Sequence, residues 1–166
     1  MTEAGMVETA VHRLLSESTQ KSLETMFFAI PDGVSTNPER PHGQLISVSL
    51  TFQGTPPGRF GLLVSERLAR TLAGNFMGSE DMEELRPDEV GGVMGELANM
   101  LCGVALSDLQ SQTNFELSTP VAKHIGAEET APDFSGRGDA LGSPFVCRFE
   151  FPEGALVQFL AFEAAQ

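Results

Sequence analysis

The chain has 166 residues, of which 41% are hydrophobic, and this length and composition suit one globular domain with a substantial core. Its 23 acidic against 10 basic residues give a formal net charge of −13, which argues against nucleic acid or an anionic membrane as a partner. It has no run of about 18 apolar residues and no basic-then-apolar N-terminus, so we expect neither a membrane span nor a signal peptide. We therefore expect a single cytoplasmic domain over residues 1–166.

The first half of the chain predicts a long helix, a strand hairpin and a short helix. Residues 1–8 are expected to be disordered. Apolar residues at helical spacing then mark one face of the first helix: Val11, Leu14, Leu15, Leu23, Met26 and Phe27. In chain order, the expected elements are a helix at 7–30, a loop at 34–43, strands at 45–52 and 59–65, a helix at 66–77 and an acidic connector at 78–86.

The second half predicts the same order, a long helix followed by strands. Pro120 would confine its part of the first of these strands to a sheet edge or a bulge. The expected elements are a helix at 87–113, a strand at 115–124, a mobile loop at 126–143, and strands at 145–151 and 155–162 joined by a tight turn at 152–154. This repetition predicts a pseudo-symmetric two-layer α/β (α+β) sandwich, with one mainly antiparallel sheet packed on long helices.

One helix carries the candidate site. On a helical wheel of residues 87–113, one side gathers Val90, Val93, Met94, Leu97, Leu101 and Val104. Glu96 and Asn99 fall on the opposite side as neighbours three residues apart, together with Gly92, Gly95 and Gly103. Because glycine costs roughly 1 kcal/mol relative to alanine inside a helix, this face weakens the helix without a packing gain. An acid and a carboxamide on a cleared face predict a docking and catalytic surface.

Other residue types offer no competing site. His12, His42 and His124 are scattered without metal-ligand spacing, and Cys102 and Cys147 have neither metal nor disulfide spacing, so we expect reduced thiols and no metal site. The sequence also contains no P-loop and no G-x-S-x-G motif. Glu96 and Asn99 therefore remain the catalytic candidates.

The segment Gly95-Glu96-Leu97-Ala98-Asn99-Met100-Leu101-Cys102-Gly103 resembles the E-x-x-N helix of the CheC/CheX/FliY family of response-regulator phosphatases. The segment from Leu72 to Gly78 resembles the CheX branch in particular, and the resemblance covers roughly residues 11–163. It implies a CheC-like sandwich, hydrolysis of the phospho-aspartate of a CheY-like receiver domain, and a homodimer. Phe27 stands where a second asparagine would be, which implies one site. The chain departs from the CheC-type pattern at Gly92, in place of Asp or Ser, and at Pro120, which follows Asn99 too closely.

The residues suggest a division of roles. Asn99 would position a water in line with the P–O bond, as a glutamine does in GTPases. Glu96 would pair with the receiver's lysine, and Mg²⁺ would come from the receiver rather than from this chain. Two alternatives stay open: a non-catalytic signalling module that binds receivers, and a small-ligand-binding α/β dimer that uses the sheet face.

Overall fold

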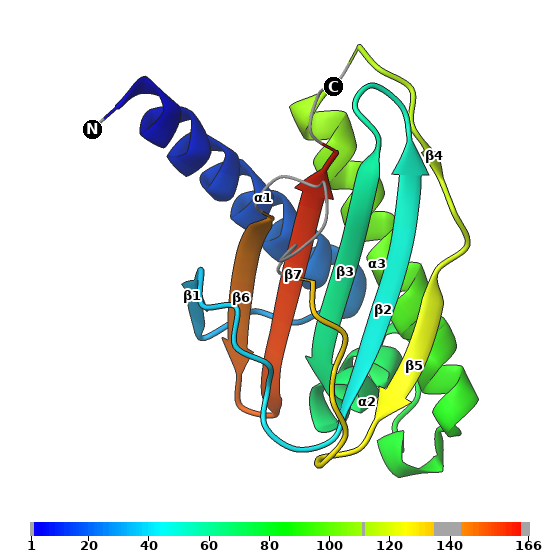
Figure 1. Cartoon of the computed structure of the whole chain (residues 1–166). Helices are drawn as coiled ribbons and strands as arrows, with labels where there is room; N and C mark the ends of the chain where they lie inside the picture. Colours follow the sequence, from blue (N-terminus) through cyan, green and yellow to red (C-terminus); the bar gives the residue numbers. More distant parts are fainter. Residues whose placement is uncertain (1, 111, 135–143, 164–166) are drawn as a thin grey trace.

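A computed structural model describes residues 2–110, 112–134 and 144–163 of the chain. One antiparallel sheet forms a layer, and the helices cover one of its faces (Figure 1). The helices are α1 (Glu3–Phe27), α2 (Glu66–Met77), the 3₁₀ turn η1 (Met82–Glu84) and α3 (Pro87–Leu109). The strands are β1 (Gly33–Ser35), β2 (Leu45–Gln53), β3 (Gly58–Ser65), β4 (Glu116–Leu117), β5 (Val121–Ile125), β6 (Phe145–Phe151) and β7 (Gly154–Phe162).

The strand order shows the predicted pseudo-symmetry. The order is β1-β6-β7-β3-β2-β4, and β5 also pairs with β2. The strand that follows each long helix pairs with the hairpin of the other half: β1 with β6, and β5 with β2. Exchanging α1-β1-β2-β3 with α3-β5-β6-β7 therefore maps the sheet onto itself, with β3 and β7 paired at its centre. The predicted sandwich is confirmed.

The first helix begins earlier and ends sooner than the sequence predicted. It starts at Glu3, and the hydroxyl of Thr2 accepts a hydrogen bond from the Gly5 amide at 3.1 Å, so residues 2–8 form a capped helix start rather than a disordered tail. It ends at Phe27 because Phe28 adopts a left-handed conformation, with φ 53°. The loop expected at 34–43 also overlaps a short strand, since β1 pairs with β6 along residues 33–35.

Pro120 divides the strand predicted at 115–124. β4 and β5 lie on either side of it, and both pair with β2. Proline cannot donate to a strand ladder, which is why the edge of the sheet breaks at this position. Of the loop expected to be mobile at 126–143, residues 126–134 form no helix or strand, and Phe134 is buried against the sheet. Residues 135–143 lie outside the described residues.

The main core fills the space between sheet and helices. The sheet supplies alternate residues of its central strands: Ile46, Val48, Leu50, Phe52, Phe60, Leu62 and Val64. The helices supply Leu15, Leu23, Phe27, Leu68, Leu72, Met94 and Leu97. Two predicted core positions are corrected, because Met26 and Val104 are exposed. Thr19 instead takes a buried place in the α1 stripe, where its hydroxyl donates to the Gln158 side chain at 2.7 Å.

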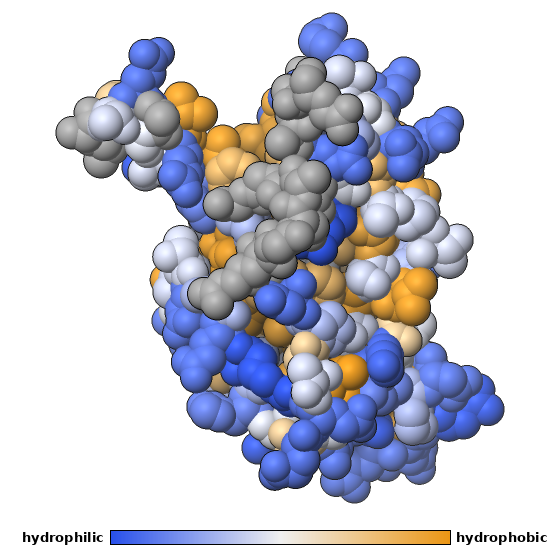
Figure 2. Space-filling view, viewed as in Figure 1, coloured by the Kyte–Doolittle hydropathy of each residue, from blue (hydrophilic) through white to orange (hydrophobic). Residues whose placement is uncertain are grey.

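The opposite face of the sheet carries a smaller apolar cluster: Leu45, Leu63, Ile125, Phe134, Val146, Val157 and Phe159. Figure 2 shows this face, where the lower half of the molecule presents mainly hydrophilic side chains. By length and composition α3 could also cross a membrane, but 61% of its apolar window is buried inside the protein. We conclude that α3 is a core helix.

Candidate functional site

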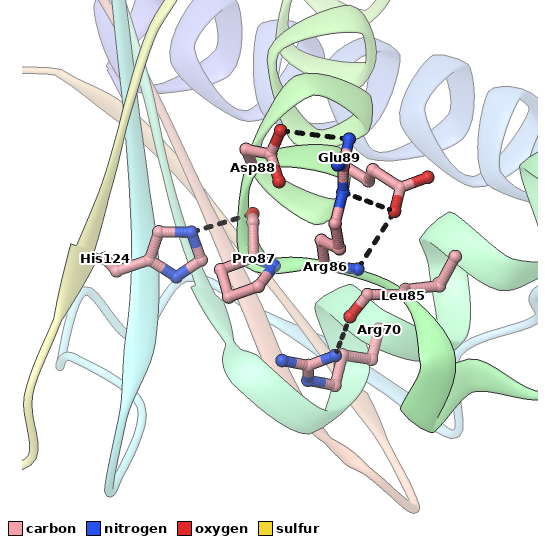
Figure 3. A network of polar contacts seen from close by, with 7 residues as sticks. All are labelled: Arg70, Leu85, Arg86, Pro87, Asp88, Glu89 and His124. Atoms are coloured by element: carbon pink, nitrogen blue, oxygen red, sulfur yellow. Dashed lines mark hydrogen bonds and ion pairs between the residues drawn. The ribbon is translucent and has the colours of Figure 1, made fainter.

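The start of α3 is fixed against its neighbours by polar contacts (Figure 3). The ring Nε2 of His124, on β5, lies 3.0 Å from the carbonyl oxygen of Pro87, the first residue of α3. The carboxylate of Glu89 accepts from the backbone N–H of Arg86 at 3.1 Å, which satisfies one of the free amides at the helix start. On the other side of the helix start, the guanidinium of Arg70, on α2, donates to the carbonyl oxygen of Leu85 at 2.8 Å. These contacts hold the first turn of α3 between α2 and β5.

Glu96 and Asn99 lie on the outward face of α3, as the helical wheel predicts. Both side chains are exposed, whereas Leu97 and Leu101 between and after them are buried. Within the part of the chain that the structure describes, neither Glu96 nor Asn99 makes a side-chain hydrogen bond or an ion pair. Their polar atoms therefore remain available to a second molecule.

The glycines of α3 divide into two kinds. A methyl group added at Gly92 or Gly103 would meet no atom within 4 Å, so these two positions do leave the outward face open. Gly95 differs from the prediction, because a methyl group there would lie 3.6 Å from the Cβ of Pro120. Gly91, which the sequence did not single out, faces β5 in the same way, at 3.6 Å from the ring of His124. A methyl group at Gly91 or Gly95 would therefore make ordinary van der Waals contact with the segment 120–124, and these two glycines face that segment rather than solvent.

A groove of about 650 Å³ runs between α3 and the segment 119–124. It is lined by Pro87, Asp88, Gly91, Gly92, Gly95, Glu96, Thr119, Pro120, Ala122 and His124. Glu96 therefore lies on the wall of a concave surface, whereas Asn99 lies about one turn further along α3 and is not among the lining residues. The sequence indicated one wall of this groove but missed the wall formed by Thr119, Ala122 and His124.

The first long helix presents no second acid–amide pair at the position that the sequence compared. Phe27 is fully buried and stacks on Phe76 with ring centroids 5.1 Å apart. Glu24 is exposed one turn before it. The expectation that Phe27 belongs to the core is confirmed.

The two cysteines are free thiols, as predicted, and both are buried. Burial disfavours the charged thiolate, which raises the pKa of Cys102 to about 12 and that of Cys147 to about 11. At neutral pH both side chains are therefore protonated and apolar in character, and they serve packing rather than chemistry.

Comparison with known proteins places these observations in a family. The family model described as "Chemotaxis phosphatase CheX" matches residues 46–133, more than half of the chain. This match includes the whole of α3 and the opposing wall of the groove. A search of curated proteins found no match.

Solved structures share the fold. A CheC-like superfamily protein from Shewanella sp. PV-4 is 18% identical, with a TM-score of 0.69 and with 93% of this chain and 97% of that chain covered. The chemotaxis protein CheX from Vibrio vulnificus is 22% identical, with a TM-score of 0.67 and coverages of 92% and 96%. A chain of the CheX–CheY–BeF₃–Mg²⁺ complex from Borrelia burgdorferi is 13% identical, with a TM-score of 0.65 and coverages of 92% and 97%.

Proposed function

Because the chain belongs to the CheX family of chemotaxis phosphatases, we propose that it hydrolyses the phospho-aspartate of a CheY-like receiver domain, using the outward face of α3. The observation that carries this proposal is the exposed pair Glu96 and Asn99, which has no partner within the described residues and is flanked by the open positions Gly92 and Gly103. Such a face can enter another protein's active site without first breaking contacts of its own.

Asn99 is the proposed positioning residue for the attacking water. A phospho-aspartate is an acyl phosphate, and its hydrolysis needs a water held in line with the P–O bond that breaks. The carboxamide of Asn99 can accept a hydrogen bond from that water and donate one to it or to a phosphoryl oxygen. Attack of the water on phosphorus then releases inorganic phosphate and returns the aspartate carboxylate. Positioning of this kind contributes through orientation, which can supply several orders of magnitude in rate.

Glu96 is the proposed docking residue. Its carboxylate is exposed at the wall of the groove, so a lysine of the receiver can reach it. A charge-assisted hydrogen bond between the two would fix how α3 enters the receiver's site. Asp88 lines the same groove, although its carboxylate lies 3.4 Å from Arg86 and is partly neutralised. The groove therefore favours a positively charged contact.

The receiver would supply the remaining chemistry. We propose that Mg²⁺ comes with the receiver and that this chain binds no catalytic metal of its own. This chain shares its fold with one chain of the CheX–CheY–BeF₃–Mg²⁺ complex from Borrelia burgdorferi, and that likeness supports a receiver as the partner. A cytoplasmic location and a homodimer are further parts of the proposal, since a receiver-domain substrate is cytoplasmic and the family resemblance implies a dimer.

A non-catalytic module that binds receivers with the same helix is the alternative. The two functions separate in one assay on the purified chain, with each receiver domain of the source genome phosphorylated by acetyl phosphate. We expect phosphate release from at least one receiver to rise with the concentration of this chain and to stop when Mg²⁺ is chelated. Binding of a phosphorylated receiver without any change in its rate of dephosphorylation would support the alternative.

A further inference from the structure

A second exposed surface lies where α1 and α2 end, on the helix side of the sheet (Figure 1). Five large apolar side chains are exposed there: Met26 (44%), Phe28 (73%), Ile30 (69%), Phe76 (39%) and Met77 (46%). The two segments are joined, since Phe27 stacks on Phe76 and the Asn75 side chain donates to the Phe27 carbonyl at 2.9 Å. We call these five residues the Phe28 patch.

The backbone at Phe28 caps the end of α1 in a conformation that disfavours a residue with a side chain. Its φ of 53° is left-handed, and it is the one described residue other than glycine with a positive φ. A left-handed conformation brings Cβ close to the carbonyl oxygen, which is why glycine is preferred at this position after a helix. The same chain ends α2 with Gly78 in the equivalent conformation, at φ 69°. A phenylalanine in this position, with most of its ring in solvent, points to a role outside the monomer's own packing.

The charged side chains that flank the patch residues in the sequence have one sign. Within residues 24–34 and 75–84 the ionisable side chains are Glu24, Asp32, Glu80, Asp81, Glu83 and Glu84, with no Lys or Arg. All six are exposed, and in the described part of the chain none of them forms an ion pair with a basic residue. An apolar centre with an acidic border is complementary to a segment that is apolar on one side and basic at its edges.

We propose that the Phe28 patch docks a basic amphipathic helix of a partner protein. The partner's apolar side chains pack against Phe28, Ile30 and Met77, and its Lys and Arg side chains lie over the surrounding carboxylates. The two methionines suit such a surface, because their unbranched side chains adapt to the shape of an incoming helix. A second copy of this chain fits less well, since self-association would bring six carboxylates against six. An anionic membrane is disfavoured by the same charge.

The test uses a fluorescein-labelled helical peptide of leucine and lysine, with the leucines on one face, and a matched peptide of leucine and glutamate. Fluorescence anisotropy should show binding of the leucine–lysine peptide, weakened by salt, and no binding of the leucine–glutamate peptide. Phe28→Gly should weaken binding by about tenfold or more, because a central aromatic anchor is lost. This variant should melt at the same or a higher temperature, since glycine relieves the left-handed strain. No receiver is present, so the result does not depend on the phosphatase activity.

Met6→Ala is the matched control, because Met6 is an exposed apolar residue at the opposite end of α1, and its loss should leave peptide binding unchanged. Glu80→Lys should weaken binding and reduce its dependence on salt. Equal binding of both peptides by the wild-type chain, or unchanged binding by Phe28→Gly, would overturn the proposal. So would a lower oligomeric mass of Phe28→Gly than of wild type in light scattering, since the patch would then be a contact between copies of this chain.

Discussion

Replacing Gly92 by leucine should stabilise the protein and abolish its action on a receiver. Gly92 lies inside α3, one turn before Glu96, and a Cβ built there meets nothing within 4 Å. The leucine side chain would therefore stand in open solvent on the face that we assign to docking. It would occupy space that a receiver needs, while costing the monomer no steric clash.

The magnitude follows from this exposure. Glycine in a helix interior is less favourable than leucine by roughly 0.6–1 kcal/mol, and no lost contact offsets that gain. For a domain of this size, such a gain corresponds to a rise of about 1–4 °C in melting temperature. Gly103→Leu, one turn beyond Asn99, should behave in the same way, since its Cβ position is also open.

Calorimetry and receiver dephosphorylation, measured on the same preparations, test the expected rise in melting temperature and the expected loss of activity. Gly92→Ala is the control: it should show a similar rise in melting temperature and a smaller loss of activity, because a methyl group protrudes less. A fall in melting temperature would show that Gly92 faces packed atoms. Full activity in a more stable Gly92→Leu protein would show that the receiver binds elsewhere.

Three further predictions concern Glu96 and the two cysteines. Glu96→Ala should mainly raise KM for the phosphorylated receiver, with kcat little changed, because the proposed lysine contact exists in the bound state and in the transition state alike; saturation kinetics measures this. Cys102 and Cys147 should react with a thiol reagent at pH 8 only after unfolding, since burial raises their pKa values to about 12 and 11. Because the thiols of the unfolded chain ionise with the ordinary cysteine pKa of 9.0, the free energy of unfolding should fall as pH rises above 9. Rapid labelling of the folded protein, or stability that is flat from pH 8 to 11, would contradict this.

Local pattern predicted most of the fold. Residues 66–77 and 145–151 were predicted as they are observed, because their apolar periodicity coincides with clear turn and helix-start residues. The strand at 45–52, observed as β2, and the position of Phe27 on the apolar face of the first helix were also predicted. The apolar pattern did not predict where α1 ends, because the left-handed backbone of Phe28 decides this. The ring of Phe28 is exposed.

Of the two walls of the groove, the sequence predicted only the one that α3 forms. The helical period of α3 is a local property, so the outward placement of Glu96 and Asn99 could be read from the sequence. The opposing wall depends on strand register. His124 pairs with Ile46 and Ala122 with Val48, and because Ile46 and Val48 face the helices, His124 and Ala122 do so as well. That register is set by tertiary pairing, which the spacing of residues along the chain does not contain.

The measurement that tests the account most directly is the rate of phosphate release by Asn99→Ala under a saturating concentration of one phosphorylated receiver with Mg²⁺. Asn99 is exposed and makes no side-chain contact in the described structure, so its loss should change the free energy of unfolding by no more than about 0.5 kcal/mol. The account predicts a kcat lowered by about a hundredfold or more, with receiver binding retained, because the attacking water loses its orientation. A kcat within about twofold of wild type, with the fold intact, would contradict the assignment of Asn99 as the residue that positions the water.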